Sequence, residues 1–301
     1  MNVSLVVLGV ALVAALTAFT LSATRSIALD PVDPAAEERA FVRYLWHHPR
    51  FRRFLRERFD RKSAGGFLLT IGFILAFAVS FVLGSLLDMI DSNEGLARAD
   101  RSVSEWGSHH ADWDAVEILR WITHLGSTSV VMIALALAFV YDYARHRNRD
   151  VALFLAAVGI GVWMLNNGLK LLVSRERPDV LRLVDAGGWS FPSGHSATAA
   201  AGAAAVALIL SRDRRRRTRA LFTASAALVA VAVATSRALL GVHWLTDVIA
   251  GLALGWGWFM LVAVLFGGRL QVLGEPVVEA GAASPPADSP AADTRSELSS
   301  R

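Results

Sequence analysis

WSFPSGHS, residues 189–196, is the stretch of the sequence that points most directly to both the fold and the chemistry of this chain. It lies between two apolar segments, and Pro192 and Ser193 are residue types that favour the start of a helix. The apolar run 197–210 predicts the helix that follows, with His195 in its first turn. A first turn carries unpaired backbone N–H groups and the positive end of the helix dipole, so the stretch predicts an anion site. Taken alone, the same residues also fit an ordinary helix cap with a surface histidine.

The composition indicates a membrane protein. Hydrophobic residues make up 54% of the 301 positions, charged residues only 19%, and the mean hydropathy is +0.45. This is more apolar surface than a soluble domain needs. The chain has no cysteine, which excludes disulfides, thiol catalysis and Cys-based metal sites. The net charge of +4 is compatible with nucleic acid, but the basic residues lie between apolar runs, where membrane topology explains them, so no nucleic-acid partner is expected.

Seven apolar runs predict the fold class, an all-α, polytopic membrane helix bundle. Several of the runs are shorter than the roughly 20 residues that cross a bilayer, so their helices are expected to extend into the flanking polar residues. The runs are 3–21, 67–90, 127–143, 151–173, 197–210, 220–236 and 244–266.

Changes in composition divide the chain into four parts. Residues 1–23 form an N-terminal transmembrane anchor, and the lack of a preceding basic residue favours an uncleaved span over a signal peptide. Residues 24–64 form a basic linker, in which apolar side chains at helical spacing within 51–59 fit an amphipathic helix on the membrane and a solvated linker equally. Residues 65–268 hold the other six spans. Residues 269–301, rich in Ala, Pro and Ser, predict a disordered tail.

The longest internal loop, 91–126, carries one further predicted element. Its segment Asp112–Leu125 alternates polar and apolar residues at helical spacing, which predicts an amphipathic helix on the membrane surface, with His124 packed near its end. His109 and His110 lie close to two aspartates, but without the i, i+4 spacing of a helical metal site. The sequence therefore predicts no metal centre.

The arginines predict the orientation. If the spans alternate, twenty-two of the thirty lysines and arginines fall on one side, in the loops 24–66, 144–150 and 211–219 and after residue 266. The positive-inside rule assigns that side to the cytoplasm, and so predicts a multi-pass protein of the plasma or inner membrane. Eight basic residues remain on the outer side.

Three of those eight, Lys170, Arg177 and Arg237, stand near the outer ends of spans, where a charge is costly unless a partner compensates it. Their spans end on the same face as the segments of His195 and His243, so these side chains can converge on one anion. The alternative is that each cation pairs with a local acid such as Glu176, Asp179 or Asp185. That alternative is favoured for Arg175 and Arg182.

Three spaced motifs hold these residues, and together they resemble the signature of a known family. The motifs are Lys170-x6-Arg177-Pro178, Pro192-Ser193-Gly194-His195 and Ser236-Arg237-x5-His243-x3-Asp247. In order and internal spacing they resemble those of the type 2 phosphatidic acid phosphatase (PAP2) superfamily, in its membrane-bound lipid phosphatase branch. The resemblance covers roughly residues 65–268 and implies a six-helix core, here with one extra N-terminal span.

The resemblance also implies roles for the matching positions. His243 is expected to attack phosphorus as a neutral imidazole and to form a phosphohistidine, with Asp247 fixing its tautomer. His195 is expected to protonate the leaving group and then to activate water. The phosphate oxygens are expected to be held by Lys170, Arg177, Ser193, Gly194 and Arg237. No cofactor or metal is implied.

The expected function is hydrolysis of lipid phosphate monoesters or diphosphates at the outer membrane face. Candidate substrates are phosphatidic acid, phosphatidylglycerol phosphate and a polyprenyl diphosphate. One alternative is a phosphotransferase, or an enzyme like the vanadate-dependent haloperoxidases, that uses the same pocket. A second is a transporter or channel, which predicts ionisable residues through the middle of the spans, whereas here they gather at one rim. The sequence does not indicate an oligomeric state.

Overall fold

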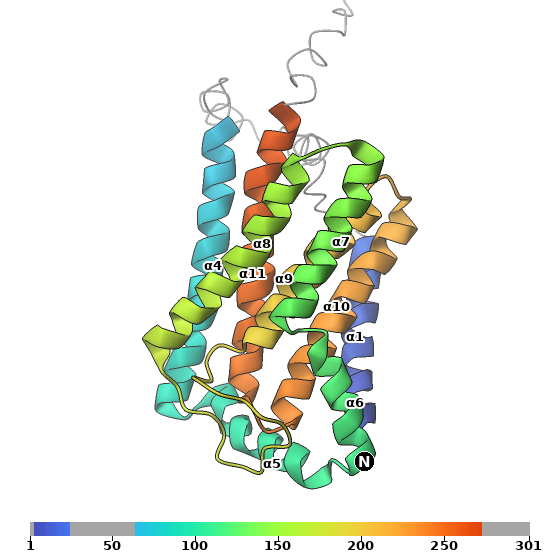
Figure 1. The fold of residues 1–301 in the computed structure, drawn as a ribbon. Helices are drawn as coiled ribbons and strands as arrows, with labels where there is room; N and C mark the ends of the chain where they lie inside the picture. Colours follow the sequence, from blue (N-terminus) through green and yellow to red (C-terminus); the bar gives the residue numbers. More distant parts are fainter. Residues whose placement is uncertain (1–2, 25–63, 273–301) are drawn as a thin grey trace, which may run out of the picture.

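The computed structural model describes residues 3–24 and 64–272, with side chains for 3–23 and 71–266, and every regular element in this part is a helix (Figure 1). The long helices are α1 (Val3–Thr24), α4 (Ala64–Ser92), α7 (Thr128–His146), α8 (Asp150–Val173), α9 (Gly194–Ser211), α10 (Arg216–Leu239) and α11 (Leu245–Val272). Between α4 and α7 lie the 3-10 turn η1 (Gly95–Ala99) and the shorter helices α5 (Asp100–His110) and α6 (Trp113–His124).

The predicted all-α membrane bundle is confirmed. Within the described residues, seven helices have the length and apolar composition needed to cross a membrane, and they are the seven predicted from the apolar runs. Most of the helices extend a few residues beyond those runs, as expected from the thickness of a bilayer. Helix α9 begins at Gly194, so His195 lies in its first turn. Helix α10 ends at Leu239, so Arg237 lies in its last turn.

Helix α9 is the centre of the bundle and packs against α7, α8, α10 and α11. Small residues allow this close packing, because the buried face of α9 consists largely of alanine. Helix α11 approaches at Gly251 and Gly255, where an added Cβ would lie 2.5 Å from the Ser193 carbonyl oxygen and 2.3 Å from that of Ala197. Glycine at these two positions therefore fixes how closely α11 approaches the N-terminal turn of α9.

Helix α1 is integrated into the bundle. It runs along α10, and its buried residues Val3, Val7 and Ala11 share one apolar cluster with Leu119 of α6 and Leu240. The predicted domain boundaries stay predictions. The basic linker with its possible helix over 51–59 and the tail after 272 lie outside the described residues.

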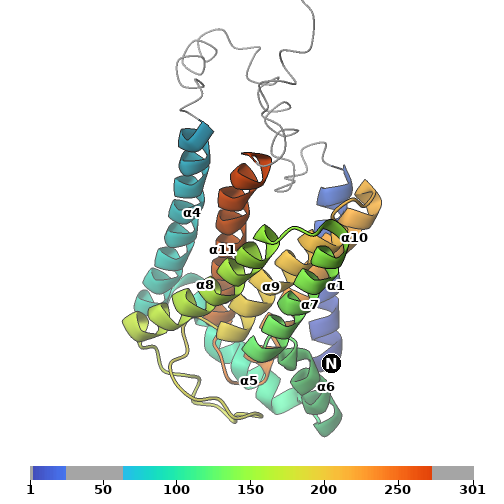
Figure 2. The ribbon, with the colours of Figure 1, turned by 45° about the horizontal axis from the view of Figure 1, so that its top comes forward.

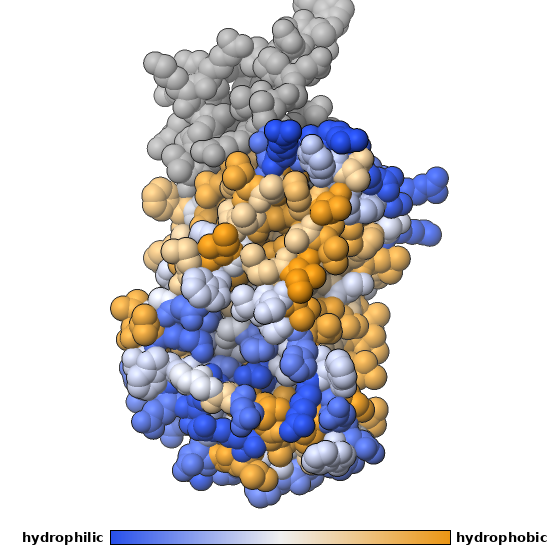
Figure 3. Space-filling view, in the orientation of Figure 1, coloured by the Kyte–Doolittle hydropathy of each residue, from blue (hydrophilic) through white to orange (hydrophobic). Residues whose placement is uncertain are grey.

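The helices alternate in direction, so the connecting loops gather at two ends (Figures 1 and 2). Helices α8 and α10 end, and α9 and α11 begin, at the lower end in Figure 1, together with α5, α6 and the segment 174–193. The loops 147–149 and 212–215 lie at the opposite end. Figure 3 shows polar side chains over the lower end and mainly apolar side chains along the helices above it. The alternation of spans on which the predicted orientation depends is therefore present, while the assignment of either end to the cytoplasm stays a prediction.

Candidate active site

His243 lies at the centre of the lower end, in the short connection between α10 and α11, and is only 1% exposed. Its Nδ1 lies 3.4 Å from Oδ2 of Asp247, and its Nε2 lies 3.2 Å from Nη1 of Arg177. A guanidinium has only donors, so Nε2 must accept and the ring proton must be on Nδ1, facing Asp247. The two contacts together define one tautomer, with the Nε2 lone pair directed toward the cation.

Asp247 is held by donors on both carboxylate oxygens. Ser190 Oγ donates a hydrogen bond to Oδ2, and the Trp244 backbone N–H donates to the same oxygen over 3.0 Å. Arg175 Nη1 donates to Oδ1 over 2.6 Å. Since Asp247 is fully buried, these bonds compensate the cost of removing its charge from water and fix the carboxylate beside His243.

Burial also sets the protonation state of the central imidazole. Removal of His243 from solvent lowers its pKa from 6.5 to about 4, although the adjacent Asp247 acts in the opposite direction. Burial has the larger effect on this pKa because the ring is enclosed. The cations Arg237 and Arg177 lower the pKa further. His243 is therefore a neutral imidazole at neutral pH, which is the state required of a nucleophile.

The three predicted cations come from three segments and lie within electrostatic reach of one another. Arg177 is held by backbone carbonyl groups, with Nη1 to Val242 at 2.6 Å, Nη2 to Gly187 at 2.8 Å and Nε to Gly188 at 3.0 Å. Lys170 Nζ, on the last turn of α8, donates to the carbonyl oxygen of Trp189 over 2.7 Å. Within the part of the chain that the structure describes, none of Lys170, Arg177 and Arg237 forms an ion pair.

Arg237 is the most poorly compensated of the three cations. It is 6% exposed, its Nε has no hydrogen-bond partner among the described residues, and its Nη1 makes a long 3.5 Å contact to Thr123 Oγ1. It lies within electrostatic reach of Arg177 and of His195. A buried guanidinium with an unsatisfied donor among other cations has the electrostatic properties of an anion site.

The first turn of α9 supplies the second histidine. His195 lies within electrostatic reach of Lys170, Arg237 and His243, and Gly194 precedes it at the start of the helix. Ser193 is fully buried, and its hydroxyl accepts a 2.9 Å hydrogen bond from Ser196 Oγ. The structure thus brings all eight predicted site residues to one end of the bundle, while their individual roles stay predictions.

Asn166 is a polar residue beside this turn that the three motifs do not include. It stands one helical turn before Lys170 on α8, is 4% exposed, and its Oδ1 lacks a partner among the described side chains. Its Nδ2 lies 3.1 Å from where a Cβ on Gly194 would stand. Asn166 therefore adds an amide to the wall of the site.

Arg175 and Asp100 are the supporting residues that sequence reasoning missed. The prediction that Arg175 pairs with a local acid is wrong. Its Nη1 binds Asp247 at 2.6 Å, and its Nη2 binds Asp100 Oδ2 at 2.8 Å. Asp100, 3% exposed at the start of α5, also accepts from the backbone N–H and Oγ1 of Thr246 at 2.8 and 2.7 Å. Arg175 thus joins α5 to α11. Asp100 gave no sequence signal, since nothing in its spacing relates it to position 247.

Two other expectations are corrected. Arg182 does not pair with an acid but binds the carbonyl oxygen of Pro178, four residues earlier, through Nε at 3.4 Å and Nη2 at 3.3 Å. His124 is the last residue of α6, beside the ring of Trp121, but it is not buried there. It is exposed and lies within electrostatic reach of His195. His109 and His110 are exposed, and no group of three potential metal ligands occurs in the described part of the chain.

These features define a multi-pass helical membrane protein with a buried His–Asp pair facing three cations. Residues 150–270 match the family model of the PAP2 superfamily. The chain is 34% identical over 148 residues to phosphatidylglycerophosphatase B of Bacillus subtilis (strain 168). The matched region covers 48% of this chain and 72% of that protein.

A solved structure agrees with this match. The chain resembles the crystal structure of a transmembrane PAP2 type phosphatidylglycerolphosphate phosphatase from Bacillus subtilis, with a TM-score of 0.56 and 29% sequence identity, over 64% of this chain and 93% of that one. The chain belongs to the PAP2 superfamily.

Proposed function

We propose that this protein is an integral membrane phosphatase that removes a phosphate group from a lipid through a phosphohistidine on His243. The observation that carries the proposal is the hydrogen bond from Arg177 to His243 Nε2, because it aims a neutral nucleophile at a position surrounded by cations. A phosphate group entering there meets Lys170, Arg177 and Arg237, none of which is neutralised by a carboxylate in the described residues.

The first chemical step forms an N–P bond and breaks a P–O bond. The Nε2 lone pair attacks phosphorus, the electron pair of the breaking bond goes to the leaving oxygen, and protonated His195 gives that oxygen a proton. The three cations stabilise the negative charge on the equatorial oxygens. Asp247 stabilises the positive imidazole ring that results, because it faces the Nδ1 proton.

The second step returns the enzyme to its starting state. Neutral His195 removes a proton from water, the resulting hydroxide attacks phosphorus, and the N–P bond breaks with its electrons returning to Nε2. Inorganic phosphate leaves, and His195 carries the proton needed for the next cycle. No other acid or base has to be invoked, and no metal is required by this scheme.

We propose phosphatidylglycerol phosphate as the first substrate to test. The support is the likeness to phosphatidylglycerophosphatase B and to the solved structure of a phosphatidylglycerolphosphate phosphatase, both from Bacillus subtilis, whose names state that activity. Phosphatidic acid and a polyprenyl diphosphate present the same terminal phosphate. The test is phosphate release by the detergent-purified protein from all three lipids with EDTA present. Release from none of them contradicts the proposed function, and release only after a divalent ion is added contradicts the metal-free scheme.

We further propose that the site faces away from the cytoplasm. The support is that the described segments 144–150 and 211–219, at the opposite end of the bundle, hold nine arginines. Reporter fusions at Arg215 and Ala186 test the orientation independently of activity. Cytoplasmic reporter activity for the Ala186 fusion would place the site, and hence its substrate, on the inner leaflet.

A further inference from the structure

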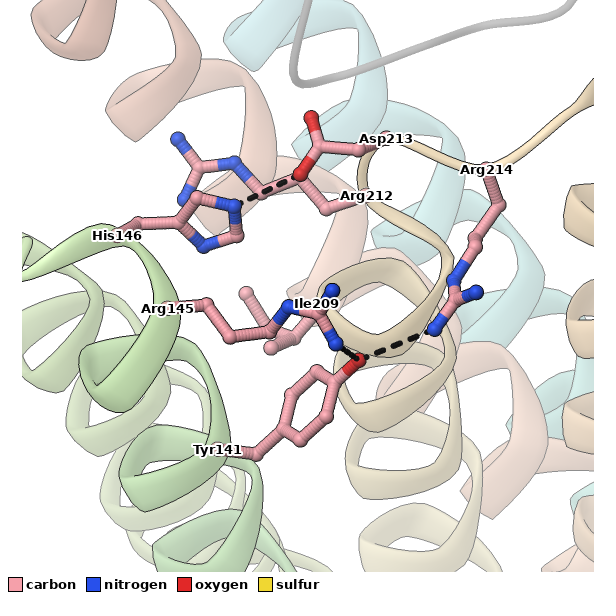
Figure 4. A pocket seen from close by; sticks show the side chains of 7 residues that line it. All are labelled: Tyr141, Arg145, His146, Ile209, Arg212, Asp213 and Arg214. Atoms are coloured by element: carbon pink, nitrogen blue, oxygen red, sulfur yellow. Dashed lines mark hydrogen bonds and ion pairs between the residues drawn. The ribbon is translucent and has the colours of Figure 1, made fainter.

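A second polar cluster lies at the end of the bundle opposite to His243, where α7 ends and α9 passes into α10 (Figure 4). It surrounds a cavity of about 80 Å³. Tyr141, Arg145 and His146 come from the last turns of α7, and the remaining lining residues come from the end of α9 and the loop after it. These are Ile209, Arg212, Asp213 and Arg214.

Part of this cluster is neutralised internally. Asp142, which is fully buried, binds Arg212 Nη1 at 3.2 Å and His146 Nδ1 at 2.8 Å. His146 Nε2 in turn binds Asp213 Oδ2 at 2.7 Å. These contacts tie α7 to the loop after α9 and account for both acids of the cluster.

The other two arginines converge on a neutral oxygen. Arg145 Nη1 donates to the Tyr141 hydroxyl over 2.9 Å, and Arg214 Nη2 donates to the same oxygen over 3.2 Å. Neither guanidinium forms an ion pair within the described residues. The Tyr141 hydroxyl accepts both bonds, and its own proton has no acceptor among those residues, so it remains able to donate.

Two like charges drawn to one neutral oxygen repel each other, and an anion between them would remove that repulsion. The site offers an anion two guanidinium forks and one phenolic O–H. Phosphate is the anion that such forks match best, because each can engage two of its oxygens. The cluster lies at the ends of helices that are long and apolar enough to span a membrane, and lipid headgroups lie at the ends of such spans.

We propose that this pocket binds the phosphate group of an anionic lipid in the leaflet opposite to the active site. The proposal does not depend on the phosphatase assignment, because no residue of the pocket belongs to that site. A free phosphate ion has the same chemistry, so the experiment must separate the two sources.

Native mass spectrometry of the purified protein, titrated with phosphatidylglycerol or with zwitterionic phosphatidylcholine, measures the binding. Wild type is expected to retain one more phosphatidylglycerol than the Arg145→Gln/Arg214→Gln variant, with no such difference for phosphatidylcholine. With roughly a fivefold contribution from each arginine near a membrane surface, the double change is expected to weaken apparent affinity about 25-fold. Tyr141→Phe, which removes only the hydroxyl, is expected to weaken it less.

Arg147→Gln is the matched control, because Arg147 caps the same helix but does not line the pocket. Equal loss of lipid in this control, or equal retention by the double variant, overturns the proposal. Melting temperature and phosphate release, measured on each variant, exclude loss of the fold. Equilibrium dialysis with inorganic phosphate forms the second arm. Arginine-dependent binding of phosphate but not of phosphatidylglycerol overturns the lipid as the source.

Discussion

Arg177 Nη1 lies 3.2 Å from His243 Nε2 and 2.6 Å from the Val242 carbonyl oxygen, so one cation contacts both the imidazole ring and the backbone next to it. The contact engages the Nε2 lone pair with a guanidinium N–H. A phosphate oxygen that takes over this N–H would free the lone pair at the position where phosphorus arrives. In the proposed mechanism, Arg177 would therefore couple substrate binding to the exposure of the nucleophile.

Arg177→Lys is expected to reduce kcat/KM by about 10²–10³-fold, which corresponds to the roughly 2.7–4 kcal/mol lost with one oxyanion donor. Lysine retains the charge but cannot bind three carbonyl groups and His243 at once. Inhibition by vanadate, which resembles the five-coordinate transition state, should weaken in parallel. Arg182→Gln, a change in the same loop, is the control. Unaltered vanadate inhibition in Arg177→Lys would show that the cation does not face the phosphate.

Asp100→Asn is expected to lower kcat about tenfold, or about 1.4 kcal/mol in barrier height, with KM little changed. The amide cannot accept at both positions, so Arg175 loses the charged partner that orients it toward Asp247. Glu105→Gln on the same helix, which removes a partly exposed partner of Arg101, is the matched control. If Asp100→Asn lowers the melting temperature but leaves kcat unchanged, Asp100 contributes to stability and not to turnover.

Gly255→Ala is expected to destabilise the bundle by about 1–3 kcal/mol, since its Cβ would stand 2.3 Å from the Ala197 carbonyl oxygen. Thermal unfolding in detergent measures the effect. Gly84→Ala adds the same methyl group to α4 where nothing lies within 4 Å, and it should be neutral or slightly stabilising. Equal melting temperatures for the two variants would contradict the close approach of α9 and α11.

Burial of neutral His243 predicts a pH dependence of stability. Its pKa is about 4 in the folded chain and 6.5 when exposed, so between these values the unfolded state binds more protons. Stability is then full above pH 6.5 and falls as the pH drops toward 4, by on the order of 3 kcal/mol at 1.36 kcal/mol per pKa unit. His243→Gln should flatten this part of the pH profile of unfolding, whereas exposed His109→Gln should not. Identical profiles for His243→Gln and wild type would contradict the assigned protonation state.

The sequence was sufficient to predict the spans and the motif residues, because both depend on local patterns. Apolar runs locate the helices. The spacings from Lys170 to Arg177 and from His243 to Asp247 can be read directly from the sequence. The site at one end of the bundle follows from alternation of the spans. Glycines that fit between α9 and α11 show only in the structure, since their partners are backbone atoms distant in sequence.

The supporting network could not be predicted for the same reason. Asp100 lies in a loop whose helix α5 has no long apolar run, and its partners Arg175 and Thr246 are 75 and 146 positions away. Arg175 looked like a residue with a local acid because Glu176 follows it directly. Only the packing of α5 against α11 shows that the guanidinium of Arg175 binds Asp247.

The central claim is that His243 becomes phosphorylated during turnover. Rapid acid-free quenching of His195→Ala with a lipid phosphate carrying an activated leaving group should trap acid-labile phosphate on His243, because this variant can form the N–P bond without an acid but hydrolyses it slowly. His243→Ala should show neither label nor turnover. Phosphate found on a serine, or turnover that persists in His243→Ala, would contradict the account.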